Sequence, residues 1–212
     1  MTPRTALEHG VAELGVELPA QAPEQLLAYA ALLGKWNKTY SLTAVREPLA
    51  VVSHHLLDSL AALPHLPMSQ DDALADIGSG AGLPGIPLAI ARPGWQVCLA
   101  EANQKKAAFL RQATIELKLR NARVHEGRVE GWKPSSGFSV VISRAFASLA
   151  QFAHACAHLV AKGGSLVAMK GILRADELAE MRAWDCAVVE LHVPLLKAVR
   201  HLVVCRPATA SR

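Results

Sequence analysis

Three glycines at alternate positions follow an apolar segment in the first half of the chain. Residues 76–85 read Asp-Ile-Gly-Ser-Gly-Ala-Gly-Leu-Pro-Gly, directly after the apolar residues 73–75. Glycine has no Cβ atom, so a backbone that contains Gly78, Gly80 and Gly82 can adopt positive φ angles and approach a ligand closely. A helix that begins just after them would offer free N–H groups to a polar or anionic ligand. The segment is therefore typical of a nucleotide-binding turn.

Two kinds of nucleotide ligand fit this turn. Gly80, Gly82 and Gly85 match the Gly-x-Gly-x-x-Gly fingerprint of dinucleotide-binding proteins. Asp76, followed by Gly78, Gly80 and Gly82, matches the pattern of S-adenosylmethionine-dependent methyltransferases instead. The carboxylate favours the methyltransferase, because it suits a loop that faces a sulfonium and an ammonium group and is a poor neighbour for a pyrophosphate. A glycine turn without any ligand is the third alternative.

A second carboxylate stands where an adenosine would need one. The next predicted strand, residues 96–101, ends at Glu101. A carboxylate can accept hydrogen bonds from both ribose hydroxyls of an adenosine, whichever cofactor carries it. We therefore expect Glu101, together with Asp76, to belong to the cofactor site.

The elements that position these residues change in character near residue 70. Before it, apolar residues recur at helical spacing, and three helices are predicted at about 7–18, 26–34 and 48–63. After it, predicted strands alternate with helices, which indicates a mostly parallel sheet covered on both faces. The strands are expected at 73–77, 96–101, 123–125, 139–142, 165–169, 187–193 and 201–205.

The last two of these strands are close enough in sequence to pair antiparallel. An antiparallel end on a doubly wound parallel sheet favours the methyltransferase sheet over the dinucleotide-binding one. We predict an α/β protein with a Rossmann-like S-adenosylmethionine-dependent methyltransferase fold: a mostly parallel seven-stranded sheet with an antiparallel last strand. Residues 1–70 are expected to form an N-terminal helical extension, and residues 71–212 the methyltransferase domain.

Composition sets broad limits on the function. The 212 residues carry a formal charge of +4, which is compatible with a nucleic-acid partner but does not establish one. Apolar stretches are too interrupted for a transmembrane helix, and the first residues lack an apolar signal core. The four cysteines are widely scattered without a Cys-x-x-Cys motif, so we expect buried, reduced thiols in a cytoplasmic protein rather than disulfides or a zinc site.

Several separated blocks of the sequence resemble blocks found in one family of proteins. The chain resembles the glucose-inhibited division protein B family, the bacterial 16S ribosomal RNA (guanine-N7)-methyltransferases, from about residue 26 to residue 206. One departure is Ser41, where the family usually has Asn. The blocks are Trp-Asn-Lys at 36–38 with Leu-Thr at 42–43, His-Leu-Leu-Asp-Ser-Leu at 55–60, the glycine turn at 76–87, Lys-Lys at 105–106 with Phe-Leu at 109–110, Gly-Arg-Val-Glu at 127–130, Ile-Ser-Arg-Ala-Phe-Ala at 142–147, Lys-Gly at 170–171 and His-Leu-Val-Val at 201–204.

The resemblance implies that S-adenosylmethionine is the cofactor and that the substrate is 16S ribosomal RNA or the small-subunit particle. The residues that it implies for cofactor contact are Gly78, Leu83, Val129, Glu130 and Arg144. The turn chemistry described above adds Asp76, Gly80, Gly82 and Glu101.

Other side chains are candidates for holding the RNA. Phe146 follows the strand at 139–142 and could stack on the target guanine, or it is a core ring below the sheet edge. Each basic candidate for phosphate contact could equally be a solvated surface charge. These candidates are Lys38, Lys105, Lys106, Arg128 and Lys170, with Arg46 extending the surface.

No residue is assigned as a general base, because N7 of guanine carries an in-plane lone pair and needs no deprotonation. His54-His55 and the pair His154 and His158 lack the carboxylates or cysteines that would complete a metal site, so no metal is expected. His55 and Asp58 are expected to form a structural hydrogen-bonded pair or part of the cleft wall. We also expect a monomer.

Two other classes of function stay open at this point. A methyltransferase acting on protein or a small molecule would keep the glycine turn and need no RNA surface. A non-catalytic nucleotide-binding regulator or a dinucleotide oxidoreductase would use the other frame of the glycines.

Overall fold

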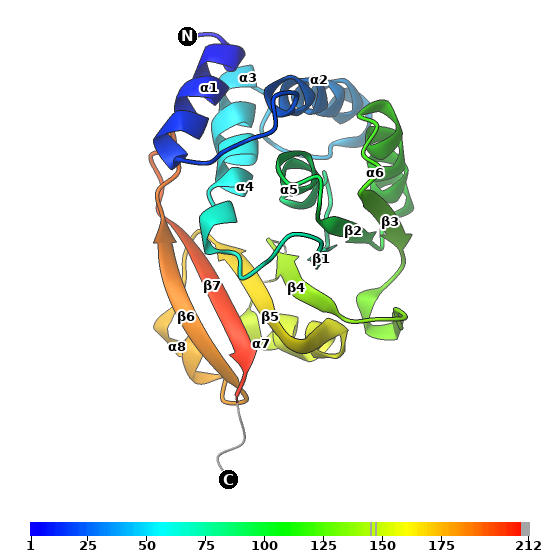
Figure 1. Ribbon diagram of the computed structural model, residues 1–212, viewed down its shortest axis with the longest axis vertical. Helices are drawn as coiled ribbons and strands as arrows, with labels where there is room; N and C mark the ends of the chain where they lie inside the picture. The colour runs from blue at the N-terminus through cyan, green and yellow to red at the C-terminus, as the bar shows by residue number, and fades with distance from the viewer. Residues whose placement is uncertain (145, 147, 209–212) are drawn as a thin grey trace.

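A single seven-stranded sheet runs through the molecule, with helices on both faces (Figure 1). The computed structural model describes residues 1–144, 146 and 148–208. Its strands are β1 (Ala73–Ile77), β2 (Gln96–Glu101), β3 (Ala122–Glu126), β4 (Phe138–Ser143), β5 (Val160–Lys170), β6 (Trp184–Leu191) and β7 (Arg200–Pro207).

The strand order is β3-β2-β1-β4-β5-β7-β6. The first five strands pair in parallel, and β7 pairs antiparallel with both β5 and β6. The order reverses direction at β1 and β4, and ligands of open α/β sheets bind beside such a switch point. The predicted α/β fold, with its antiparallel last strand, is confirmed.

The helices divide between the two faces of the sheet. Their bounds are α1 (Pro3–Leu14), α2 (Ala22–Tyr40), α3 (Pro48–Val51), η1 (Val52–Leu57), α4 (Asp58–Leu60), η2 (Leu63–His65), α5 (Gly85–Ala91), α6 (Gln104–Glu116), η3 (Val129–Gly131), α7 (Leu149–Cys156), η4 (Ala157–Leu159) and α8 (Ala175–Ala179). Figure 1 shows α1 to α6 gathered on one side of the sheet and α7 and α8 on the other.

The strand sequences explain this two-layered covering. Successive side chains of a strand point to opposite faces, so Leu74 of β1 joins one buried apolar cluster while its neighbour Ala75 joins the other. The first cluster contains Leu7, Tyr29 and Leu56 from the N-terminal helices. These helices therefore share their core with the sheet, and the division of the chain at residue 70 stays a prediction.

Helix α2 is longer than expected. The sequence predicted an end near Gly34, but the helix continues to Tyr40 and is followed by Ser41 in the left-handed region, at φ 49°. Apart from its chain neighbours and the nearby backbone of its own helix, no atom of the described residues lies within 4 Å of the place where a Cβ on Gly34 would stand, so this glycine faces open space without breaking the helix. The apolar face continues past it, since the Trp36 ring packs against Phe109 at 5.6 Å.

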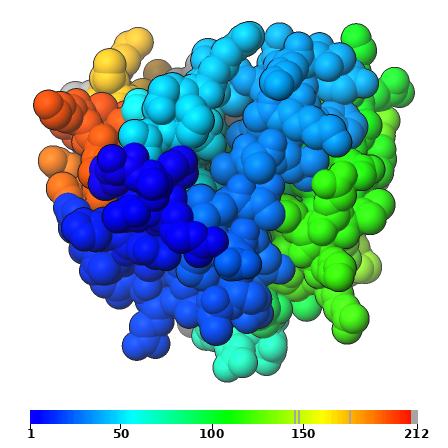
Figure 2. Space-filling view, turned by 90° about the horizontal axis from the view of Figure 1, so that it is seen from above, coloured from blue at the N-terminus to red at the C-terminus, as the bar shows by residue number. Residues whose placement is uncertain are grey.

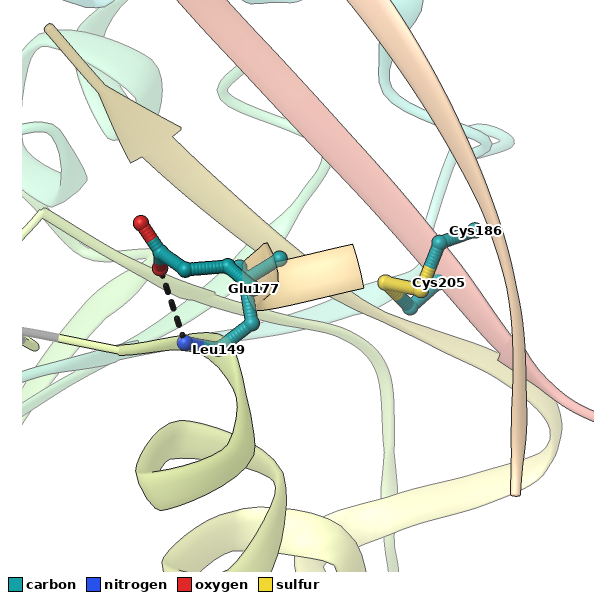
Figure 3. Close-up of a disulfide and its surroundings, with 4 residues drawn as sticks. All are labelled: Leu149, Glu177, Cys186 and Cys205. Atoms are coloured by element: carbon teal, nitrogen blue, oxygen red, sulfur yellow. Dashed lines mark hydrogen bonds between the residues drawn. A yellow bond between two sulfur atoms is a disulfide. The ribbon is translucent and has the colours of Figure 1, made fainter. Parts of the chain in front are cut away.

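The prediction of four reduced cysteines is wrong for one pair. Cys186 and Cys205 are register partners on β6 and β7 and form a disulfide, while Cys98 and Cys156 are buried free thiols. Figure 3 shows this disulfide joining the two neighbouring strands. The antiparallel register brings together two residues that are 19 positions apart, which the spacing of cysteines alone did not indicate.

Among the described residues, none of the helices is both long enough and apolar enough to span a bilayer.

Candidate functional site

The glycine turn after β1 has the backbone conformation that its sequence requires. Gly78, Gly80 and Gly82 have φ angles of 66°, 59° and 89°. At Gly82 a Cβ would also stand 2.8 Å from Cγ1 of Ile86, at the start of α5. A side chain at this position would be strained by both its backbone angle and its neighbour. The turn can therefore pass closely over the end of the sheet and lead directly into α5.

The Asp76 side chain holds this turn in place by hydrogen bonds. Its side chain is fully buried, and its Oδ2 accepts hydrogen bonds from Ser79 Oγ at 2.6 Å and from the Gly85 N–H at 2.9 Å. Burial raises the pKa of Asp76 to about 6, and the bonds from Ser79 and Gly85 oppose that rise. Oδ1 has no hydrogen-bond partner among the described residues. Asp76 therefore connects the end of β1 to both the turn and the start of α5.

Glu101 connects the same turn to the next strand. Its Oε2 accepts from the Gly80 N–H at 2.8 Å and its Oε1 from the Asn103 N–H at 2.8 Å. The Ser79 N–H adds a bond to the carbonyl of Ala100 at 3.0 Å. Each carboxylate oxygen keeps a second lone pair, so Glu101 can accept further hydrogen bonds while it holds the turn.

Three neighbouring hollows surround the turn. The carboxylate hollow, of about 220 Å³, is lined by Ile77, Gly78, Ala100, Glu101, Ala102, Gly127, Arg128, Val129, Glu130 and Phe146. The glycine hollow, of about 180 Å³, is lined by Leu42, Thr43, Gly78, Ser79, Gly80, Ala81, Leu83 and Arg144. The basic hollow, of about 220 Å³, is lined by Leu33, Gly34, Asn37, Lys38, Thr43, Val45, Arg46 and Val51.

Two residues connect these hollows in a row. Gly78 lines both the carboxylate and the glycine hollow, and Thr43 lines both the glycine and the basic hollow. The row therefore runs from the acidic end of β2, over the glycine turn, to the loop between α2 and α3. It brings together residues from both sides of residue 70.

The carboxylate hollow gathers four of the nine residues expected to hold the cofactor. Glu101, Val129 and Glu130 stand around it, with Gly78 at its border with the glycine hollow. Phe146 lines this hollow and is half-buried, with its ring centroid 5.0 Å from that of Phe152. Phe146 does not line the glycine hollow with Arg144, so its role as a platform for the target guanine stays a prediction.

Arg144, in the glycine hollow, is held by a buried carboxylate. Its Nη1 donates to Asp58 Oδ2 at 3.1 Å and to the His54 carbonyl at 3.4 Å. The other oxygen of Asp58 accepts from Nε of Arg200 at 3.0 Å. The Asp58 side chain is 2% exposed, so a buried carboxylate is balanced by two guanidinium groups.

The expected pairing of His55 with Asp58 is therefore wrong. Asp58 pairs with Arg144 and Arg200, and His55 bonds to Thr43 instead. His55 Nδ1 donates to the carbonyl of His54 at 2.9 Å, which leaves Nε2 to accept from Thr43 Oγ1 at 2.8 Å. Burial, the largest cause, lowers the pKa of His55 to about 4. The neutral imidazole therefore fixes the Thr43 side chain between two hollows.

The Asn37 side chain binds the backbone of the same loop at Thr43. Its Nδ2 donates to the Thr43 carbonyl at 2.9 Å and its Oδ1 accepts from the Thr43 N–H at 2.9 Å. Thr43 Oγ1 also accepts from the Val45 N–H at 3.1 Å. The positioning roles of Asn37, Thr43 and Asp58 were not predicted from the sequence, although all three lie in the blocks that carry the family resemblance.

The candidate RNA-contacting residues lie in different places. Lys38 and Arg128 line the basic and carboxylate hollows, respectively. Lys105 is exposed and Lys106 half-buried in the first turn of α6, whose end Asn103 caps by accepting from both of their N–H groups. Lys170 is 10% exposed and pairs with Glu177, which also accepts from the Leu149 N–H at 3.3 Å (Figure 3). Lys170 is therefore committed to Glu177 and is a poor phosphate ligand.

The described part of the chain holds no group of three or more His, Cys, Asp or Glu side chains arranged to bind a metal ion.

Solved structures share this architecture. A methyltransferase from Thiobacillus denitrificans, described as S-adenosylmethionine-dependent and in complex with S-adenosyl-L-homocysteine, matches with a TM-score of 0.58 and 12% identity, over 82% of this chain and 98% of that one. A predicted O-methyltransferase from Agrobacterium tumefaciens matches with a TM-score of 0.56 and 24% identity, over 74% and 81%. The strand order, with the glycine turn at its switch point, is the Rossmann-like fold that these methyltransferase structures share.

The sequence then places the chain within that class. Residues 22–203 match the GidB family, described as rRNA small subunit methyltransferase G. Curated relatives named Ribosomal RNA small subunit methyltransferase G are 49% identical in Nitrosospira multiformis, over 98% of this chain and 99% of the relative, and 52% identical in an Azoarcus species, over 93% of each. The chain belongs to the rRNA small subunit methyltransferase G family, as its sequence blocks predicted.

Proposed function

We propose that this protein transfers the methyl group of S-adenosylmethionine to N7 of a guanine in 16S ribosomal RNA. The observation that carries the proposal is the row of hollows, because it joins a carboxylate suited to ribose, a close-approaching glycine turn and an arginine in one cleft. Membership of the rRNA small subunit methyltransferase G family supports ribosomal RNA as the acceptor.

The carboxylate hollow suits the adenosine part of the cofactor. Glu101 keeps free lone pairs for two ribose hydroxyls, and Val129 offers an apolar side chain for the adenine. Glu130 and Phe146 complete the wall on the same side. In this proposal Phe146 closes the adenosine site rather than stacking on the target guanine.

The glycine hollow suits the methionine part and the reacting atoms. Gly78, Gly80 and Gly82 let the backbone approach, and Leu83 provides an apolar contact. Arg144 can bind a carboxylate or a phosphate with the guanidinium nitrogens that Asp58 leaves free. Asp76 stabilises the conformation of the turn through its bonds to Ser79 and Gly85.

Positioning is the main task of these residues. Bound S-adenosylmethionine supplies an electrophilic methyl group, and N7 of guanine supplies an in-plane lone pair. The chain therefore has to hold the two in line and exclude water, and good alignment can contribute on the order of 7–11 kcal/mol. The reaction needs no general base and no metal. One chain provides all three hollows, so we propose a monomer as the active unit, acting in the cytoplasm where ribosomal RNA is found.

Methyl transfer to purified RNA tests the proposal. We expect radioactive methyl groups from S-adenosylmethionine to enter deproteinised small-subunit RNA, the 30S particle, or both. Calorimetry should show binding of S-adenosylhomocysteine and no binding of NAD. Incorporation into protein or small molecules alone, or binding of NAD without S-adenosylhomocysteine, would refute the proposal.

A further inference from the structure

We infer that the basic hollow binds a nucleotide of the RNA that flanks the target guanine, with its phosphate between Lys38 and Arg46. This inference rests on the proposed function and adds to it a subsite for the substrate.

The basic hollow lies beside the glycine hollow. Thr43 lines both cavities, so they meet at this residue. The glycine hollow holds Arg144 and the glycine turn, where the methyl group would be transferred. A strand of RNA that places one base beside the turn must continue past Thr43 or leave the surface. The basic hollow is the cavity that it meets on that side.

The basic hollow carries two positive charges. Lys38 lies in the last turn of α2, and Arg46 lies in the loop before α3. Both side chains are exposed, and neither has a hydrogen-bond or ion-pair partner among the described residues. The neighbouring carboxylate of Glu47 is used to cap α3, where it accepts from the Ala50 N–H at 2.6 Å. Two cations without partners at one cavity suit an anionic group.

The basic hollow combines apolar and charged surface. Leu33, Val45 and Val51 give it apolar lining in addition to its two cations. A nucleotide presents the same pair of features, an apolar base face and an anionic phosphate, and proteins bind single-stranded RNA by matching both. Figure 2 shows the blue and cyan residues of the N-terminal segment covering the face seen from above, with green residues of the α6 region beside them.

Hydrogen bonds hold the loop that lines the basic hollow. The loop that carries Val45 and Arg46 is fixed at Thr43, whose backbone binds Asn37 and whose hydroxyl binds His55. Thr43 Oγ1 then accepts from the Val45 N–H. The cavity is therefore formed before RNA arrives, and binding does not have to order this loop.

Phosphate interference tests the subsite. Small-subunit RNA is ethylated at random phosphates and then separated into bound and unbound fractions with each protein. We expect ethylation within about two nucleotides of the methylated guanine to reduce binding to the unmodified protein. The variant Lys38→Ala/Arg46→Ala should lose this local interference, and its KM for RNA should rise about tenfold. The slope of its log binding constant against log salt concentration should become shallower, by the amount expected for the loss of about two phosphate contacts.

Lys35→Ala is the matched control, because Lys35 lies on the same helix, is exposed, and does not line the hollow. It should keep the interference pattern, the KM and the salt dependence. Binding of S-adenosylhomocysteine should be the same in all three proteins. An unchanged interference pattern in Lys38→Ala/Arg46→Ala, or an equal change in Lys35→Ala, overturns the subsite. Absence of methyl transfer by the unmodified protein would refute the proposed function instead, whereas the subsite alone fails if the unmodified protein methylates the RNA and the double variant keeps its interference pattern.

Discussion

Asp58 and Arg144, 86 positions apart in the chain, form an ion pair of 3.1 Å beside the glycine turn. The carboxylate belongs to the N-terminal helices and the arginine follows β4, so the pair joins the helical part to the sheet. Arg200 binds the other oxygen of Asp58 from the start of β7. The position of a proposed cofactor ligand therefore depends on a residue that does not line the cleft.

Replacing Asp58 by Asn should weaken catalysis by misplacing Arg144. The amide can accept only one of the two guanidinium bonds, and its NH₂ group would face the other arginine. We expect a loss of about 10- to 100-fold in kcat/KM and about 1–3 kcal/mol in stability. Steady-state kinetics and urea unfolding measure these two effects.

Two further variants separate positioning from stability. Arg200→Gln removes the other half of the cluster and keeps the Asp58–Arg144 pair, so it should lose less activity for a similar loss of stability. Arg144→Ala should abolish most activity with the fold intact. If Asp58→Asn and Arg200→Gln lose equal activity, Asp58 has a structural role and does not position Arg144.

Replacing Glu101 by Gln should weaken cofactor binding. Gln is neutral and keeps one acceptor oxygen, so both the Gly80 N–H and the Asn103 N–H lose a charged partner, and one of them loses its acceptor. Hydrogen bonds to charged groups contribute about 1.5–3 kcal/mol, which predicts about a 10- to 100-fold rise in the Kd of S-adenosylhomocysteine by calorimetry. Glu126→Gln is the control, because Glu126 is the register partner of Glu101 on β3 and binds the surface residue Arg111. Equal effects of both substitutions would contradict the role given to Glu101.

His55 should make stability depend on pH. Its folded pKa of about 4 lies below the ordinary value of 6.5, so its contribution is complete above pH 6.5 and declines as the pH falls toward 4. At pH 5 the loss should be about 2 kcal/mol relative to pH 7. His55→Gln keeps an acceptor for Thr43 and cannot titrate, so its stability should change less between these pH values. Identical pH profiles for the two proteins, from urea unfolding, would assign the dependence to other groups.

Gly85→Ala should destabilise the start of α5. A Cβ there would overlap Leu99 and stand 2.7 Å from Asp76 Oδ2, the oxygen that accepts from the Gly85 N–H. Overpacking of a buried site costs about 1–3 kcal/mol, which thermal unfolding can detect. At Gly131 a Cβ would meet nothing within 4 Å, so Gly131→Ala is the matched control and should be close to neutral. A neutral Gly85→Ala would show that the turn adjusts freely.

The sequence best predicted those features that depend on residues close together in the chain. Strands β1 and β2 have the predicted bounds, because each is a mostly apolar run with a carboxylate at its last or last but one residue, just before a turn or helix. The turn itself was predictable, since its glycines are required by positive φ angles. Helix α2 was predicted too short, because Gly34 lowers helix propensity but its exposed position leaves the packing of the helix intact.

Contacts between distant residues could not be read from the sequence. The spacing of His55 and Asp58 suggested a pair within one helix, but tertiary packing gives each a partner from another segment: Thr43 for His55, and Arg144 and Arg200 for Asp58. The disulfide depends in the same way on the register of β6 against β7. The row of three hollows depends on how the loop before α3 sits against the glycine turn.

The most direct test of the central claim is to identify the methylated atom. Small-subunit RNA from cells with and without this protein can be compared by mapping N7-methylguanosine, which makes the RNA chain susceptible to cleavage at that base. We predict one guanine whose N7 methylation is present with the protein, absent without it, and absent when the protein carries Arg144→Ala. Identical N7-methylguanosine patterns in both cells, or a protein-dependent methyl group on another atom, would contradict the proposed function.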